Sequence, residues 1–210
     1  MNGPGFEQVM RAGDTAPTPE LDLVEAARAQ EYALLAALLT RAPDGARLQR
    51  IARLTGDMTP LGHAHAALAA AATAHSPEQI EREYFDLFIG IGRGEVLPYG
   101  SYYLTGFLHE RPLARLRADL QRLGIERIAP QSEPEDHAAI LCEIMAGLAA
   151  GKFPAAPEQQ RQFFEKHLAP WMGQFFVDLA AAKMADFYRS VGAVGRLFIE
   201  IETQAFALAR

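Results

Sequence analysis

The side chains best suited to chemistry lie together in the stretch Ser132-Glu133-Pro134-Glu135-Asp136-His137. A carboxylate beside an imidazole can serve in general acid–base catalysis. Adjacent residues of a helix nevertheless point about 100° apart, so Asp136 and His137 cannot form a triad-like dyad with each other. Ser132 and Glu135 also match a capping box, and carboxylates at a helix N-terminus complement its dipole. The stretch therefore predicts a capped helix start, and a small Asp/His hydrolase stays only as an alternative.

The remaining histidines and the single cysteine do not complete a catalytic or metal site. His137 would need further metal ligands, and His63 and His65 stand two residues apart, so their side chains diverge on a helix. Cys142 lies near an apolar helix face without an activating neighbour, as a small core residue would. We expect no catalytic residue, no metal site and no cofactor. A single cysteine excludes a disulfide framework, which fits a reducing compartment.

Three glycines at alternate positions, Gly90, Gly92 and Gly94, raise the question of a phosphate-binding loop. A dinucleotide fingerprint needs the spacing G-x-G-x-x-G between a strand and a helix, whereas these glycines follow a segment of helical periodicity. No Lys-Ser or Lys-Thr pair follows them, which excludes a P-loop. Alternate glycines after a helix instead indicate a loop that turns with little steric hindrance.

Tyrosines gather directly after this loop, where Tyr99, Tyr102 and Tyr103 fall within five residues. Tyrosine combines a large apolar face with a hydroxyl, and it is favoured where proteins grip peptides. Aromatic residues more often fill the space between helices. The tyrosine stretch alone leaves both interpretations open.

Helices must position all of these side chains, because nearly every segment after the first residues has apolar residues at helical spacing. The same start signal, a hydroxyl acceptor at the N-cap followed by proline, occurs at Thr18-Pro19, Thr59-Pro60 and Ser76-Pro77. The last of these helices is expected to end at Gly90 and to bury Ile80, Tyr84, Leu87 and Phe88. No alternating run bounded by hairpin turns is present. The sequence predicts an all-α bundle of roughly eight or nine helices and no sheet.

Composition indicates the class of protein and its surroundings. Of 210 residues, 50% are hydrophobic and 22% charged, and the net charge of −6 argues against a general binder of nucleic acid or anionic membranes. The chain shows neither an export signal nor ~20 consecutive apolar residues, so we expect a cytoplasmic protein without an integral membrane segment. We expect residues 1–17 to form a flexible tail and residues 18–210 a single all-helical domain, with a candidate hinge near 124–132.

Several stretches together resemble one protein family: YFDLFIGIGRGEVLPYGSYY, EPEDHAAILCEIM, and FFEKHLAPWMGQFF with FYRSVGAVGRLFIEIE. In this order, from about Glu20 to the C-terminus, the chain is similar to the TorD/DmsD/NarJ family of cytoplasmic chaperones for molybdenum-cofactor enzymes. The resemblance implies an all-helical fold and no enzymatic activity. It also implies binding of the twin-arginine signal peptide of an apo molybdoenzyme, which assists molybdenum-cofactor insertion and prevents premature Tat export.

The resemblance further implies a peptide groove on residues of these motifs. Its members would be Tyr84, Leu87, Phe88, Tyr99, Gly100, Ser101, Tyr103, Glu135, Asp136 and His137. Asp136, with Glu133 and Glu135 nearby, would pair with the peptide's arginines, while apolar side chains and tyrosines would cover its apolar part. Several family members carry Trp where this chain has Tyr84 or Tyr99, which leaves the details of the groove open.

The implied partners are the signal peptide and the apo form of a molybdopterin-containing oxidoreductase, with the protein itself a monomer or a dimer. Dimethyl sulfoxide or trimethylamine N-oxide reductase, formate dehydrogenase and nitrate reductase all stay open as clients. One alternative needs no groove: a helical adaptor that binds a folded client through another surface. None of these hypotheses involves nucleic acid.

Overall fold

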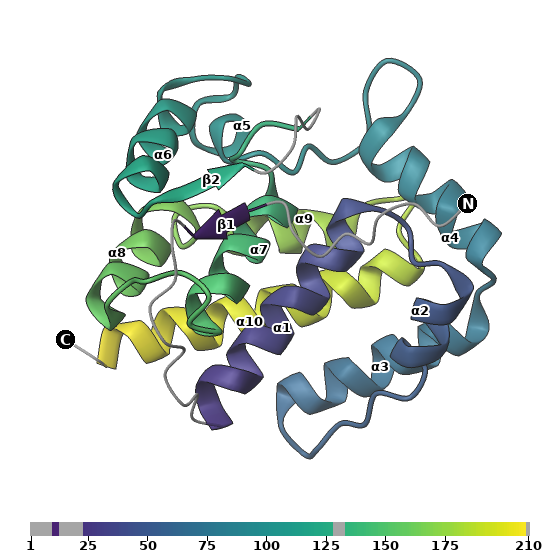
Figure 1. The fold of residues 1–210 in the computed structure, drawn as a ribbon. Coiled ribbons are helices and arrows are strands. Elements are labelled where there is room, and N and C mark those ends of the chain that lie inside the picture. Colours follow the sequence, from purple (N-terminus) through teal and green to yellow (C-terminus); the bar gives the residue numbers. More distant parts are fainter. Residues whose placement is uncertain (1–9, 13–22, 128–132, 209–210) are drawn as a thin grey trace. The chain divides into compact units, whose positions relative to one another are not determined.

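The computed structural model describes residues 10–12, 23–127 and 133–208, and helices account for most of them (Figure 1). Over these residues the chain forms ten α-helices: α1 Leu23–Thr40, α2 Gly45–Ile51, α3 Pro60–Ala74, α4 Pro77–Tyr84, α5 Gly100–Thr105, α6 Arg111–Arg122, α7 Ala138–Ala149, α8 Pro157–His167, α9 Met172–Ala181 and α10 Phe187–Leu208. One π-helical turn, η1, covers Phe85–Ile89 and directly follows α4. The predicted all-α class is confirmed. The six-residue α5 was not expected, because so short a helix shows no periodicity in the sequence.

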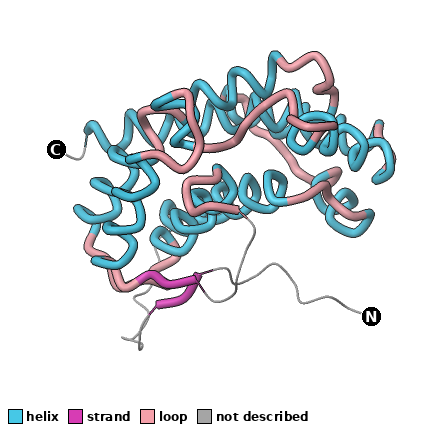
Figure 2. The backbone as a smooth tube through the Cα atoms, turned by 90° about the horizontal axis from the view of Figure 1, so that it is seen from above, coloured by secondary structure: helices cyan, strands magenta, loops and turns pink. Residues whose placement is uncertain are grey.

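Two three-residue strands add an element that the sequence does not predict. β1, Met10–Ala12, and β2, Ile125–Arg127, pair antiparallel, with Met10 opposite Arg127. Figure 2 shows the pair in magenta. Strands of this length carry no alternating pattern that a sequence can reveal. Of the expected tail 1–17 only Met10–Ala12 is described, and the part of the expected hinge beyond residue 127 also lies outside the described residues.

The predicted helix starts at residues 59 and 76 are confirmed. Thr59 caps α3, and its Oγ1 accepts from the Gly62 N–H at 3.0 Å. Ser76 and Gln79 form a reciprocal capping box at the start of α4, with bonds of 2.8 Å and 3.3 Å. These caps satisfy N–H groups that have no partner within the helix. The third start signal, Thr18-Pro19, lies outside the described residues.

The chain divides into two compact units. Unit 1 comprises Met1–Ala37 and Tyr99–Leu168, and unit 2 comprises Leu38–Pro98 and Ala169–Arg210. Unit 1 therefore holds α5 to α8, the β1–β2 pair and most of α1. Unit 2 holds α2 to α4, η1, α9, α10 and the last residues of α1. The chain passes between the units three times, after Ala37, Pro98 and Leu168, and the first of these boundaries lies inside α1, where the sequence gives no sign of it.

Each unit contains one helix in which many residues are buried. In unit 1, nearly all of α7 is buried, including Cys142, in agreement with the core role expected of that residue. In unit 2, α10 packs on α9 through Gly192 and Gly195, where an added Cβ would overlap Phe176. Glycine at these two positions lets the helices approach closely, and α10 continues through both of them.

Candidate functional site

The residues expected to line a peptide groove divide between the two units. Unit 1 holds seven of them: Tyr99, Gly100, Ser101, Tyr103, Glu135, Asp136 and His137. Unit 2 holds the other three: Tyr84, Leu87 and Phe88. Within each unit the structure brings its own set together, although the chain segments that carry the first set lie more than thirty residues apart.

In unit 1 the seven residues form a polar turn, which consists of residues 99–103 and 133–137. Tyr99 and His137 pair as an isolated antiparallel bridge, and the Gly100 N–H donates to the Asp136 carbonyl at 2.9 Å. Asp136 Oδ2 accepts twice from Ser101, from the backbone N–H at 2.7 Å and from Oγ at 2.5 Å. Asp136 therefore caps α5, whose N-cap residue Tyr99 makes no capping bond with its own side chain.

Asp136 combines burial with an incomplete set of hydrogen bonds. The residue is 3% exposed, and its Oδ1 is a buried oxygen without a hydrogen-bond partner among the described residues. A buried acceptor that lacks a donor costs about 1–3 kcal/mol, so such groups are uncommon in folded proteins. Oδ1 therefore has the capacity to accept a further hydrogen bond.

His137 caps the following helix and is neutral. Its Nδ1 accepts from the Ala139 N–H at 3.1 Å, and its ring lies edge-on to the Tyr99 ring, with 5.1 Å between centroids. An accepting Nδ1 places the proton on Nε2. Burial lowers the pKa of His137 to about 4, although Glu133 and Asp136 act in the opposite direction. His137 therefore carries no charge near neutral pH.

The predicted capped helix start at Ser132 and Glu135 is wrong. α7 begins at Ala138 with His137 as its N-cap, so Glu135 lies in the preceding turn. The helix starts late because Asp136 bonds α5 through both its backbone and its side chain, and this holds the turn outside the helix. Ser132 itself is outside the described residues.

The two glutamates of the polar turn have partners within the chain. The Tyr99 hydroxyl donates to Glu133 Oε2 at 2.5 Å, and Arg117 Nε on α6 donates to Glu135 Oε2 at 2.8 Å. Arginines of a peptide would therefore meet carboxylates that already accept hydrogen bonds from within the chain. Arg117 also shows that a guanidinium can be received at this turn. Tyr103, the remaining member, is half-buried and lies edge-on to the Tyr102 ring.

In unit 2, Tyr84 and Phe88 join Tyr188 in an aromatic cluster. Ring centroids are 4.9 Å apart for Tyr84 and Phe88, 5.9 Å for Tyr84 and Tyr188, and 5.4 Å for Phe88 and Tyr188. Both hydroxyls donate to carbonyls of the last turn of α1: Tyr84 to Thr40 at 2.9 Å and Tyr188 to Leu38 at 2.9 Å. Tyr188 is fully buried, whereas Tyr84 and Phe88 are half-buried.

The apolar side chains of the π turn differ in their exposure to solvent. Leu87 is 0% exposed and belongs to the core of unit 2, whereas η1 leaves two large apolar side chains exposed, Phe85 and Ile89. Gly90, with a φ of 61°, ends the turn as predicted. Gly94 lies too close to the backbone of Leu87 for a Cβ, and the loop returns where the Val96 N–H donates to the Leu87 carbonyl at 2.9 Å. The interpretation of the glycines as a turning loop is confirmed.

Two members of these sites were not expected from the sequence. Arg117 lies on the polar face of α6, and no local signal connects it with Glu135. Tyr188 belongs to the motif FYRSVGAVGRLFIEIE, at the start of a helix. Its presence in this motif could have indicated that it takes part in the site.

Comparison with known proteins identifies the family. Residues 55–177 match the family model of the nitrate reductase delta subunit, and this range is more than half of the chain. The chain belongs to this family, which confirms the resemblance to the TorD/DmsD/NarJ proteins. All ten residues expected to line a groove fall inside the matched range.

Two relatives and one solved structure illustrate the likeness. "Chaperone protein TorD" of Vibrio atlanticus is 26% identical over 139 residues, which are 61% of this chain and 65% of that protein. "Probable Tat proofreading chaperone DmsD" of Haemophilus influenzae is 30% identical over 116 residues, 54% of this chain and 55% of that protein. The chain thus spans less than two thirds of these relatives. A proposed redox enzyme maturation protein from Archaeoglobus fulgidus shares the fold, with a TM-score of 0.54 and 20% identity, covering 82% of this chain and 93% of that one.

The names of these relatives are those of chaperones rather than enzymes, in line with the non-enzymatic role expected from the resemblance. Among the described residues, no group of three or more His, Cys, Asp or Glu side chains could hold a metal ion. None of the helices in the described parts of the chain is long and apolar enough to span a membrane.

Proposed function

We propose that this protein is a cytoplasmic maturation chaperone that binds the twin-arginine signal peptide of an apo molybdoenzyme. By holding the peptide it would assist insertion of the molybdenum cofactor and prevent premature Tat export. One observation carries the proposal: the chain belongs to the nitrate reductase delta subunit family, and its relatives bear the names of the TorD and DmsD chaperones. The polar turn and the aromatic cluster offer the two kinds of contact that such a peptide needs.

The polar turn of unit 1 is the proposed contact for the peptide's arginines. Ser101 fixes Asp136 Oδ2, while Oδ1 accepts no bond among the described residues. A guanidinium that reached Oδ1 would form a charge-assisted bond and complete the hydrogen bonding of the carboxylate. Such bonds contribute about 1.5–3 kcal/mol, more than an exposed ion pair. Asp136 is therefore the residue on which selection for arginine should depend most.

The aromatic cluster of unit 2 is the proposed contact for the peptide's apolar section. The Tyr84 hydroxyl is already bonded to Thr40, so a peptide at this surface would meet the ring faces of Tyr84 and Phe88. Apolar burial contributes about 25 cal/mol per Å² without regard to direction, so this contact should support affinity more than selection. Leu87, fully buried, would support the cluster from within instead of touching the peptide.

Calorimetric titration of the full chain with twin-arginine signal peptides of molybdoenzymes tests the proposal. Each peptide is paired with an Arg-Arg→Lys-Lys control, which keeps the charge and removes the planar guanidinium fork. We expect saturable binding to one signal peptide, weakened by the Lys-Lys change and by Asp136→Asn, which keeps the shape of the side chain. Glu158→Gln is the matched control, because Glu158 is an exposed carboxylate of unit 1 that pairs with Arg161.

Failure of a folded, monodisperse protein to bind any signal peptide would overturn the proposal. Binding that is unchanged by Asp136→Asn and by Phe88→Ala would favour the adaptor hypothesis, in which a client is held through another surface.

A further inference from the structure

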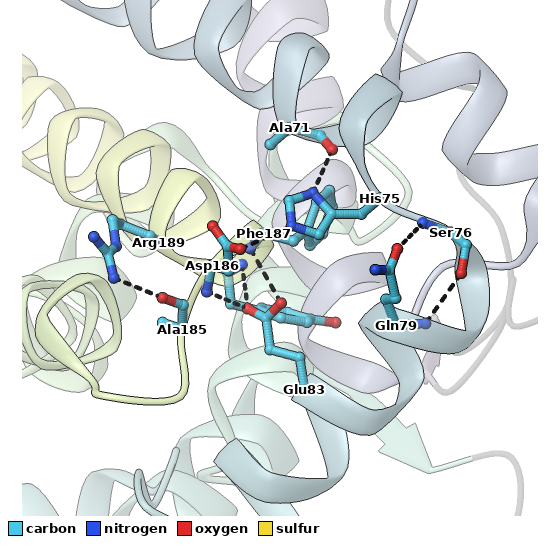
Figure 3. Close-up of polar contacts among 10 residues, drawn as sticks. Ala71, His75, Ser76, Gln79, Glu83, Ala185, Asp186, Phe187 and Arg189 are labelled. Carbon is cyan, nitrogen blue, oxygen red and sulfur yellow. Dashed lines mark hydrogen bonds and ion pairs between the residues drawn. The ribbon is translucent and has the colours of Figure 1, made fainter.

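The backbone at the start of α10 is hydrogen-bonded by an acidic side chain from another element of unit 2 (Figure 3). Glu83, near the end of α4, directs its carboxylate at the first turn of α10. Its Oε1 accepts from the N–H groups of Asp186 at 2.8 Å and Tyr188 at 2.7 Å, and its Oε2 accepts from the Phe187 N–H at 3.1 Å. Glu83 is 8% exposed. It satisfies N–H groups that have no partner inside the helix, and it complements the helix dipole.

His75, the C-cap of α3, contacts the residue that precedes α10. Its Nδ1 lies 2.8 Å from the Ala71 carbonyl oxygen, and its Nε2 lies 3.0 Å from Asp186 Oδ2 (Figure 3). Both neighbours are acceptors, so each ring nitrogen must carry a proton if both bonds are to form. A neutral imidazole has a single N–H and would have to give up one of them. Both contacts can therefore be hydrogen bonds at the same time only when the ring is doubly protonated and charged.

The first turn of α10 carries Tyr188 into the aromatic cluster. Glu83 immediately precedes Tyr84 in the chain and bonds the N–H of Tyr188, whose ring packs on Tyr84 and Phe88. A shift of this turn would move Tyr188 and so change the surface that Tyr84 and Phe88 present. The contacts that hold Asp186 can therefore affect the proposed peptide contact, because Asp186 is followed directly by Phe187 and Tyr188 at the start of α10.

We propose that Glu83 and the His75–Asp186 pair are positioning residues for the aromatic cluster, and that they make peptide binding at this cluster dependent on pH. The inference rests on the proposed function, because it concerns a peptide at that surface. The titratable groups that face the His75 ring are Asp186 before α10 and Glu83 on α4. Arg189, on the first turn of α10, bonds the Ala185 carbonyl at 2.8 Å instead.

The sign of the pH dependence follows from the contacts of His75. The bond to the Ala71 carbonyl and the pair with Asp186 raise the pKa of His75 above its ordinary value of 6.5. The contribution of these contacts is fully present below pH 6.5 and is lost as the pH rises through the pKa of the folded protein. Peptide binding should therefore be tightest on the acid side of neutrality. The Asp186 side chain is 80% exposed, so the pair is a weak one. We expect a change of about two- to fivefold in affinity.

The test measures the signal-peptide affinity of the full chain by calorimetry at about pH 6, below the ordinary pKa of histidine, and at about pH 8.5, well above it. Wild-type affinity should fall about two- to fivefold at the higher pH. His75→Gln and Asp186→Asn should remove this difference. His63→Gln, an exposed histidine of the same helix, should keep it. Glu83→Gln should weaken binding at both pH values, because its amide nitrogen would face backbone donors. Equal pH profiles for the wild type and His75→Gln would overturn the inference.

A second measurement needs no peptide. In the free protein, NMR resonances of the Tyr84 and Tyr188 rings should shift with pH at the midpoint of the His75 titration, and this shift should vanish in Asp186→Asn. If the ring resonances do not shift at the midpoint of the His75 titration, the inference is also overturned, whatever the stability of the variants. If no peptide binds at any pH, the proposed function fails and the ring titration alone decides whether His75 positions the cluster.

Discussion

The polar turn of unit 1 and the aromatic cluster of unit 2 are held together in opposite ways. Directional bonds to Asp136, Glu133 and Glu135 hold the polar turn, which contains a buried oxygen that lacks a partner among the described residues. Ring packing holds the aromatic cluster, and the hydroxyls of Tyr84 and Tyr188 are both bonded to α1. An unpartnered polar atom can discriminate between donors, whereas a satisfied aromatic face accepts any apolar segment. Selection and affinity can thus be assigned to different parts of one chain.

The largest effect is expected where a whole buried side chain of the aromatic cluster is removed. Tyr188→Ala deletes a fully buried ring and should lower the free energy of unfolding by about 3–5 kcal/mol. Tyr188→Phe removes only the bond to the Leu38 carbonyl and should cost about 1 kcal/mol. Urea unfolding followed by circular dichroism measures both. Equal losses would show that the hydroxyl, and not the ring, holds the cluster together.

The polar turn, unlike the aromatic cluster, should lose stability in acid. The pKa of His137 is about 4 in the folded chain against an ordinary 6.5, so the unfolded chain takes up this proton first as the pH falls. Stability should be full above pH 6.5 and should fall by about 1.4 kcal/mol per pH unit from there to about pH 4. Urea unfolding across this range should give a flatter profile for His137→Gln but not for His63→Gln. A wild-type profile as flat as that of His137→Gln would contradict a buried, neutral His137.

A smaller loss is expected when the cap of α5 is removed. Asp136→Ala leaves the Ser101 N–H and hydroxyl without their acceptor and should cost about 1–2 kcal/mol of unfolding free energy. Asp136→Asn keeps one accepting oxygen and should cost less than about 1 kcal/mol, since Oδ1 has no bond to lose. Thermal or urea unfolding distinguishes the two. An Asn variant as unstable as the Ala variant would contradict a cap that depends on Oδ2 alone.

The smallest losses of stability are expected from removing single tyrosine hydroxyls, and these variants test whether the polar turn and the aromatic cluster have different roles in peptide binding. Tyr84→Phe and Tyr99→Phe each remove the hydrogen bonding of one hydroxyl and should each cost about 0.5–1.5 kcal/mol of stability. Tyr84→Phe should leave peptide affinity unchanged, because the ring face remains. Tyr99→Phe removes the hydroxyl bond to Glu133 and should alter the preference for Arg-Arg over Lys-Lys peptides in calorimetry. A change of that preference in Tyr84→Phe would break the division between selection and affinity.

Much of the fold was predictable because it depends on local signals. Thr59 and Ser76 cap their helices as predicted, and Gly90 ends its segment as predicted. The β1–β2 pair joins segments far apart in the chain and is too short to show a period. The helix α5 is equally short, and its cap, Asp136, comes from a different segment. Elements of this kind depend on tertiary contacts that no local pattern reveals.

The candidate site was predictable in its residue types more than in its bonds. Asp136 and His137 do lie together with Tyr99 and Ser101, yet their sequence neighbourhood indicated a helix start that the structure places later. Leu87 was expected both on the buried face of its helix and in a peptide groove; its burial is confirmed, and its place in a groove stays a prediction. Helical periodicity could not predict the change from an α-helix to a π turn, which changes the direction of each following side chain.

The π turn after α4 also bears on how chains of different length can be compared with this one. Removing one residue from 85–89 would allow α4 to continue as a regular α-helix. The side chains before the deletion would then be rotated by about 100° relative to the glycine loop. Tyr84 could not keep its bond to Thr40 while Leu87 kept its place in the core. A relative with a one-residue gap here must therefore build its aromatic surface from other positions, and an alignment drawn straight through the gap would pair residues that do not correspond in space.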